Sequence, residues 1–281
     1  MGKVAIVTDS TATIPADVIS DLGIHVVPLT LVWGEETYLD GVEVTAEQFY
    51  ERLQSDTNFP STTQPSALEF ENVYKTIANN YDSILVITIS SELSGTYNSA
   101  VQAKDMMNDI NIEIIDTKTM SMAAGFIVLA AAKAAKEGKG LSECTSIAKE
   151  ANQNVGVLVA LDTLEYLHRG GRIGGARKLL GGALNIKPIL TVQDGIVSES
   201  GKVRTKKKAL RYLIDTVSVE LEGKTNVRLS GLHASQYADC EKILGELVDI
   251  VNPTQSLITE LSPVVGAHAG PGAIGIAWMH D

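Results

Sequence analysis

The chain has 281 residues, of which 44% are hydrophobic, and a formal net charge of −11 at pH 7. This length allows two ordinary hydrophobic cores, and the acidic balance argues against nucleic acid as a partner. The apolar runs at residues 4–7 and 123–132 are too short for a secretion signal and for a membrane-spanning helix, respectively. We therefore expect a cytoplasmic protein.

Alternating strands and helices mark the first half of the chain. Strands are expected at residues 4–7, 24–31, 84–89 and 112–115, and helices from Pro15 and at 45–53, 65–78, 94–107 and 120–136. Such alternation is typical of a mainly parallel sheet with helices on both faces. We predict an N-terminal α/β domain over residues 1–153.

The second half follows a different pattern. Asp-Gly between the β-rich runs 186–192 and 196–203 predicts a hairpin. Further strands are expected at 155–161, 227–232 and near Leu257 and Ile274, and helices at 206–221 and 237–251. We predict a C-terminal α/β domain with a mixed sheet over residues 154–281.

Hydroxyl side chains gather at three junctions, at residues 8–11, 61–66 and 90–96. Ligands of open α/β sheets bind beyond the strand ends, where helix N-termini present unpaired N–H groups. Hydroxyl and N–H groups suit a carboxylate, and Gly95 would let a ligand approach the backbone. Ser and Thr are also favoured helix caps, which explains any one cluster taken alone.

Patterns typical of enzymes and metal sites are incomplete. Ser94 lacks the first glycine of a nucleophile elbow, because position 92 is Glu. The two cysteines and five histidines show no metal-binding spacing. We predict no catalytic residue, no metal and no cofactor; the alternative is a hydrolase or acyltransferase that uses Ser94 with His268 as its base.

Eleven of the 23 Lys and Arg residues lie between His168 and Arg211, against only Asp194 and Glu199. Such a basic segment is typical of a docking face for an anionic partner, and it also fits a solvated surface. Both interpretations stay open.

Several ordered motifs resemble the DegV family of bacterial fatty-acid-binding proteins. They are TDSTA (8–12), STTQPS (61–66), SSELSGTY (90–97), RGGRI (169–173), KPIL (187–190) and HAGPG (268–272). The resemblance implies two α/β domains with a long-chain fatty acid, such as palmitate, between them. For some members it also implies a non-catalytic carrier that presents the fatty acid to a separate ATP-dependent kinase subunit.

The resemblance also implies roles for individual residues. Thr62 and Ser94 would bond the carboxylate through their hydroxyls, the Gly95 N–H would assist, and His268 would lie near the same head group. An acyl tail needs an apolar sleeve, for which the helix around residues 125–130 is a candidate; for any one of its residues, ordinary packing in the core is the favoured interpretation.

The basic segment would serve a carrier as its docking face. We expect Arg169, Arg172 and Arg204 to contact a kinase subunit or an anionic membrane surface. A sensor or structural module that is stabilised by its lipid is a further alternative, and adding a kinase subunit with ATP would distinguish it from a carrier.

Overall fold

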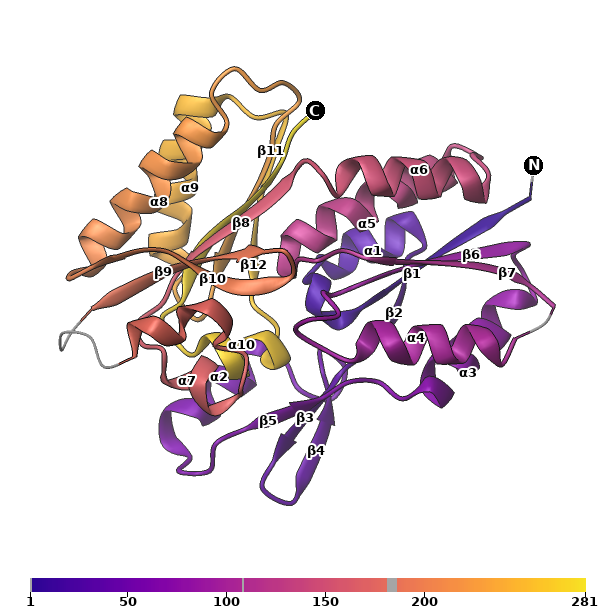
Figure 1. The fold of residues 1–281 in the computed structure, drawn as a ribbon, viewed down its shortest axis with the longest axis horizontal. Coiled ribbons are helices and arrows are strands. Elements are labelled where there is room, and N and C mark those ends of the chain that lie inside the picture. The colour runs from indigo at the N-terminus through magenta and orange to yellow at the C-terminus, as the bar shows by residue number, and fades with distance from the viewer. Residues whose placement is uncertain (1, 108, 181–185) are drawn as a thin grey trace.

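The computed structural model describes residues 2–107, 109–180 and 186–281. Two large sheets lie side by side with helices around them, and a small third sheet projects below their junction (Figure 1). In the described part of the chain, no helix is long and apolar enough to cross a membrane.

The first sheet is entirely parallel, with the order β2-β1-β6-β7. Its strands are β1 (Val4–Asp9), β2 (His25–Val27), β6 (Ser83–Thr88) and β7 (Asn111–Asp116). Helices α3 (Ala67–Ala78) and α4 (Thr96–Asp105) cover one face; α1 (Ala16–Leu22), α5 (Ser121–Lys136) and α6 (Leu141–Ala151) cover the other (Figure 1). Because both faces are covered, β1 and β6 are buried along their whole length. The predicted parallel α/β sheet is confirmed.

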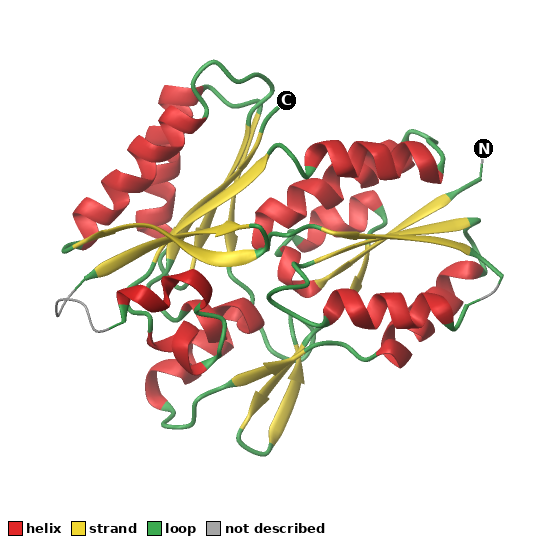
Figure 2. Cartoon of the chain, in the orientation of Figure 1, coloured by secondary structure: helices red, strands yellow, loops and turns green. Residues whose placement is uncertain are grey.

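The second sheet is mixed, with the order β10-β9-β8-β13-β11-β12. Its strands are β8 (Val155–Ala160), β9 (Lys187–Gln193), β10 (Ile196–Val203), β11 (Arg228–His233), β12 (Gln255–Glu260) and β13 (Ile274–Met279). Only β11 and β12 pair in parallel. Helices α8 (Lys206–Glu220) and α9 (Tyr237–Val251) cover its outer face (Figure 2). The mixed sheet and its hairpin are confirmed, whereas the division at residue 153 stays a prediction.

The third sheet was not predicted. It contains β3 (Thr30–Trp33), β4 (Glu36–Leu39) and β5 (Ser61–Thr63), with β3 antiparallel to both neighbours. The expected single extended run at 24–31 is divided between two sheets, because Pro28 has no backbone N–H to continue a ladder.

Several short helices complete the described part of the fold. They are α2 (Ala46–Ser55), α7 (Glu165–Arg169) and α10 (Pro263–Ala269), with the 3-10 helices η1 (Ser10–Ala12) and η2 (Gly174–Leu179). Helix α10 contacts α2, α7, β3 and β5. A segment near the C-terminus therefore packs against residues of the first half.

The largest hydrophobic core is shared by both halves of the chain. It includes Ile6 and Phe126 from the first half, and Leu190, Leu232 and Val265 from the second. Helix α5 lies between the two large sheets and contacts strands of both. This shared core packs the two large sheets against each other.

Candidate functional site

A pocket with about 940 Å³ of empty space, including space open to solvent, lies where the two halves meet. Thr11 and Ile89 line it just beyond β1 and β6, between which the strand order reverses. Asp9 ties these two strand ends together, since its Oδ2 accepts the Ile89 N–H at 2.8 Å. Ligand pockets of open α/β sheets favour such reversal points.

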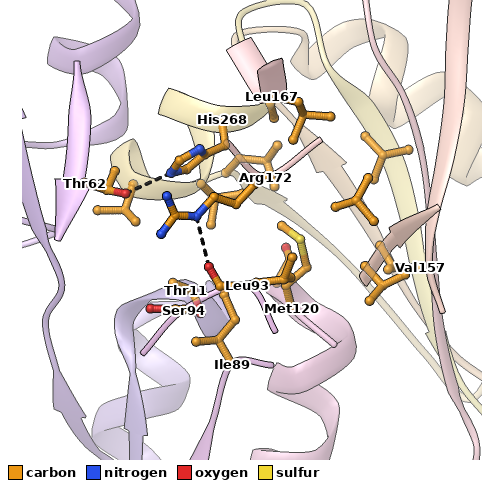
Figure 3. Close-up of a pocket in the computed structure, with 18 of the residues that line it drawn as sticks. Thr11, Thr62, Ile89, Leu93, Ser94, Met120, Val157, Leu167, Arg172 and His268 are labelled. Carbon is orange, nitrogen blue, oxygen red and sulfur yellow. Dashed lines mark hydrogen bonds between the residues drawn. The ribbon is translucent and has the colours of Figure 1, made fainter. Parts of the chain in front are cut away.

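One end of the pocket is polar (Figure 3). Thr62 Oγ1 and His268 Nε2 form a hydrogen bond of 2.8 Å. Arg172 lies beside them, where its Nε donates to the Leu93 carbonyl at 3.1 Å. Ser94 lines the same pocket. Segments far apart in the sequence therefore contribute hydroxyl, imidazole and guanidinium groups to one place.

Burial and a nearby charge alter the acid-base behaviour of His268. Its environment lowers its pKa to about 4, mainly through burial and secondarily through the positive charge of Arg172. The ring fits because residue 170 is glycine; a Cβ there would lie 2.2 Å from His268 Nδ1. His268 is therefore a neutral imidazole at neutral pH.

Ser94 and Gly95 lie at the start of α4. Ser94 Oγ lies 2.9 Å from Thr96 Oγ1 and accepts the Thr96 N–H at 3.4 Å. Ser94 thus bonds the first residue of α4 and also lines the pocket, and its role in ligand binding stays a prediction. Gly95 makes room for Gln64, whose side chain would meet a Cβ at 2.3 Å.

The three predicted docking arginines separate in space. Arg172 is half-buried and lines the pocket. Arg169 is exposed, pairs with Glu165 at 2.6 Å and lies over the Phe59 ring. Arg204 is also exposed, and it has no ion-pair partner within the described ranges.

The apolar walls come mainly from the second sheet. They include Val157, Val159, Leu161, Leu190, Val192 and Leu232. The interpretation of residues 125–130 as a sleeve is wrong, since those residues pack in the core and, of the described part of α5, Ser121 lines the pocket. Strand geometry offered a signal, since Val157 and Val159 lie two residues apart in β8 and therefore point to the same face of the sheet.

The arrangement does not pair Ser94 with His268. Ser94 bonds Thr96, and the Nε2 of His268 bonds Thr62. Across residues 2–107, 109–180 and 186–281, no group of three or more His, Cys, Asp or Glu side chains could hold a metal ion. The polar end therefore offers neutral hydrogen-bonding groups and one arginine.

A family model described as "Uncharacterised protein, DegV family" matches residues 3–281. The chain belongs to the DegV family. A DegV domain-containing protein from Caldanaerobacter subterraneus is 37% identical over 276 residues, which cover 98% of each chain. The resemblance inferred from the motifs is confirmed.

Two solved DegV structures share the fold over nearly their whole length. One is a DegV-family protein from Thermus thermophilus, whose structure is described as showing fatty acid binding. It has a TM-score of 0.94 and 32% sequence identity, and the match covers 99% of this chain and 100% of the other. Bacillus subtilis DegV, described as a fatty acid binding protein, has a TM-score of 0.93 and 31% identity, with 100% of both chains covered.

Proposed function

We propose that this DegV-family protein binds a long-chain fatty acid, such as palmitate, in the pocket between its two halves. The carboxylate would lie at the polar end with Thr62, Ser94 and His268, with help from the Gly95 N–H. The observation that carries the proposal is one pocket that joins this hydroxyl and imidazole cluster to apolar walls. The two DegV neighbours described as fatty-acid-binding support it.

The physical chemistry of a fatty acid suits both ends of the pocket. A carboxylate that leaves water must be well hydrogen-bonded, and charge-assisted bonds from hydroxyl and N–H groups are strong. Each CH₂ of the tail contributes about 0.8 kcal/mol when it is buried against the walls. The tail would supply affinity, and the polar end would fix orientation.

We further propose that the protein is a cytoplasmic carrier with two α/β domains, 1–153 and 154–281, and not a catalyst. It would present the carboxylate to a separate ATP-dependent fatty-acid kinase subunit and contact anionic membranes transiently. The hydrogen bonds of Ser94 and His268 go to different partners, which disfavours the alternative of a Ser94-dependent hydrolase.

Mass spectrometry of an organic extract, together with native mass spectrometry of the intact chain, tests the binding proposal. We expect about one fatty acid per chain. The double variant Thr62→Ala/Ser94→Ala should bind palmitate at least tenfold more weakly, because a bond to a charged group contributes roughly 1.5–3 kcal/mol.

The variant Thr76→Ala/Ser218→Ala provides the control. Both of these hydroxyls donate to carbonyls within helices away from the pocket. This control should retain palmitate. Undiminished binding in the Thr62→Ala/Ser94→Ala variant would exclude the proposed carboxylate site, and a lipid-free protein that also rejects added palmitate would exclude the proposed function.

A further inference from the structure

Three contacts fasten α10 to the region around the small sheet. Tyr50 Oη donates to the Leu261 carbonyl at 3.2 Å, just before the helix. The Val264 N–H donates to Asp40 Oδ1 at 3.2 Å, in the first turn. The bond between Thr62 and His268 lies near the other end. Since α10 has seven residues, it is too short to be stable alone, and these contacts hold it in place together with the burial of residues 263–267.

Asp40 makes the contact at the N-terminus of α10. It follows β4, is 2% exposed, and donates its own N–H to the Leu29 carbonyl at 2.9 Å. Burial raises the pKa of its carboxyl, and the Ser10 hydroxyl, the Val264 N–H and the Ser262 hydroxyl oppose that shift. An acidic side chain buried at such a cost to hydration calls for specific partners.

The first turn of α10 depends on Asp40 for one of its bonds. Pro263 has no N–H, and Ser262 Oγ accepts the N–H of Val265. The N–H of Val264 is bonded by Asp40, from the other half of the chain. His268 follows Val264 by four residues, about one helical turn, so both lie on the same side of the helix.

We propose that Asp40 is a positioning residue for the fatty-acid carboxylate: by holding Val264, it sets the helix that places His268 against Thr62. This inference rests on the proposed function. Without the bond from Asp40, α10 can shift along the small sheet, and the distance between His268 and Thr62 is no longer fixed. Val264 and Val265 of α10 also line the pocket and would move with the helix, whereas the apolar walls of the second sheet would remain in place.

Binding of palmitate and of 1-hexadecanol, which has the same chain length and no charge, tests the role of Asp40. Wild-type protein should prefer palmitate. Asp40→Ala should bind palmitate about tenfold more weakly and should lose clearly less affinity for hexadecanol, because most of the apolar wall belongs to the second sheet. Asp40→Asn should keep the preference, because its amide oxygen can still accept the Val264 N–H. If Asp40→Ala does not fold, Asp40→Ser takes its place in the test, because the serine side chain is too short for its hydroxyl to reach the Val264 N–H.

Thr205→Ala is the matched control. At the start of α8, the Thr205 hydroxyl accepts the Lys208 N–H and caps the helix. The substitution removes this cap, which lies away from the pocket. The control should keep the wild-type preference. The role of Asp40 would be overturned if Asp40→Ala weakened the binding of both ligands equally or did not weaken binding at all. Loss of the preference for palmitate in Asp40→Asn would overturn it as well. A wild-type protein that binds both ligands equally would instead refute the carboxylate site itself.

Discussion

His268 shows how one residue prepares the polar end for an anion. Its Nε2 is bonded to the Thr62 hydroxyl, and the nearby Arg172 disfavours a second positive charge on the ring. The cluster therefore combines a neutral imidazole with one permanent cation. A carboxylate that enters this end would favour protonation of His268, since an opposite charge raises the pKa of an imidazole.

The lowered pKa of His268 predicts a pH dependence of stability. The unfolded chain takes up this proton near pH 6.5, and the folded protein only near pH 4. The free energy of unfolding should therefore fall as the pH decreases from about 6.5 to 4, by an amount on the order of 3 kcal/mol from this group. Urea unfolding at pH 7 and pH 4.5 measures the change.

His268→Gln isolates this contribution. Burial also raises the pKa values of Asp9 and Asp40, and those carboxyls titrate in both proteins. The difference between wild type and variant therefore reports His268. The same pH dependence in both proteins would contradict the prediction.

The sequence motifs led to Thr62, Ser94 and His268, which the structure brings to one pocket. Arg172 was grouped with Arg169 and Arg204 on charge alone. A count of charges cannot tell which guanidinium turns inward, and the acceptor for Arg172 is the Leu93 carbonyl, 79 residues away in the chain. The motifs therefore could not predict the direction in which the Arg172 side chain points.

Among the elements, the β9–β10 hairpin joins the two halves across the pocket. The Ser90 hydroxyl is fully buried and donates to the Gly195 carbonyl at the hairpin tip, at 2.8 Å. Gly195 has a φ of +85°, and a Cβ there would lie 2.5 Å from Ser90 Oγ. Val192 and Val197 of the hairpin line the pocket. The hairpin is thus both a sheet edge and a pocket wall.

Ser90→Ala should loosen this wall. Loss of the bond to Gly195 should lower the free energy of unfolding by about 1 kcal/mol and accelerate palmitate release. Urea unfolding and stopped-flow release measure the two effects. Ser218→Ala, which removes a bond to the Ile214 carbonyl inside α8, is the control and should leave release unchanged. Equal release rates in Ser90→Ala and wild type would contradict the prediction.

Periodicity predicted the strands of the two large sheets and most of the helices that cover them, because these are long enough to repeat a pattern. Helix α6 was not among the predicted helices, although it has eleven residues. The small sheet, α7 and α10 also escaped prediction, since strands of three or four residues and single helical turns show little periodicity. Helix α5 packs in the core, which was the favoured interpretation of its apolar residues, and it is not the sleeve for which it was a candidate. It is apolar on most sides because it lies between two sheets, which resembles a lipid-facing helix in sequence.

At the scale of the whole molecule, the charge is unevenly distributed. The chain is acidic overall, yet Arg204, Lys207 and Lys208 lie together in the basic segment, exposed and without ion-pair partners among the described residues. Arg169 is already paired with Glu165. Any attraction to an anionic surface should therefore depend more on Arg204 than on Arg169.

Arg204→Glu should slow the transfer of palmitate from phosphatidylglycerol vesicles several-fold, because each basic side chain near such a surface contributes about 1 kcal/mol. Bound palmitate per chain should not change. Vesicles of neutral phosphatidylcholine should give equal rates with wild type and variant. Lys224→Glu makes the same charge change on an exposed loop outside the basic segment and should have no effect. Unchanged transfer in Arg204→Glu would contradict a docking role.

The main apolar wall and the polar end of the pocket belong to different elements. Val157, Val159 and Leu190 come from β8 and β9, whereas Thr62 belongs to β5, His268 to α10, and Ser94 to the segment before α4. Substitutions along β8 and β9 can therefore accumulate during divergence without disturbing the groups that meet the carboxylate. Descendants of one ancestral chain could in this way acquire different acyl preferences, and a protein engineer could exchange the walls while keeping the head-group site.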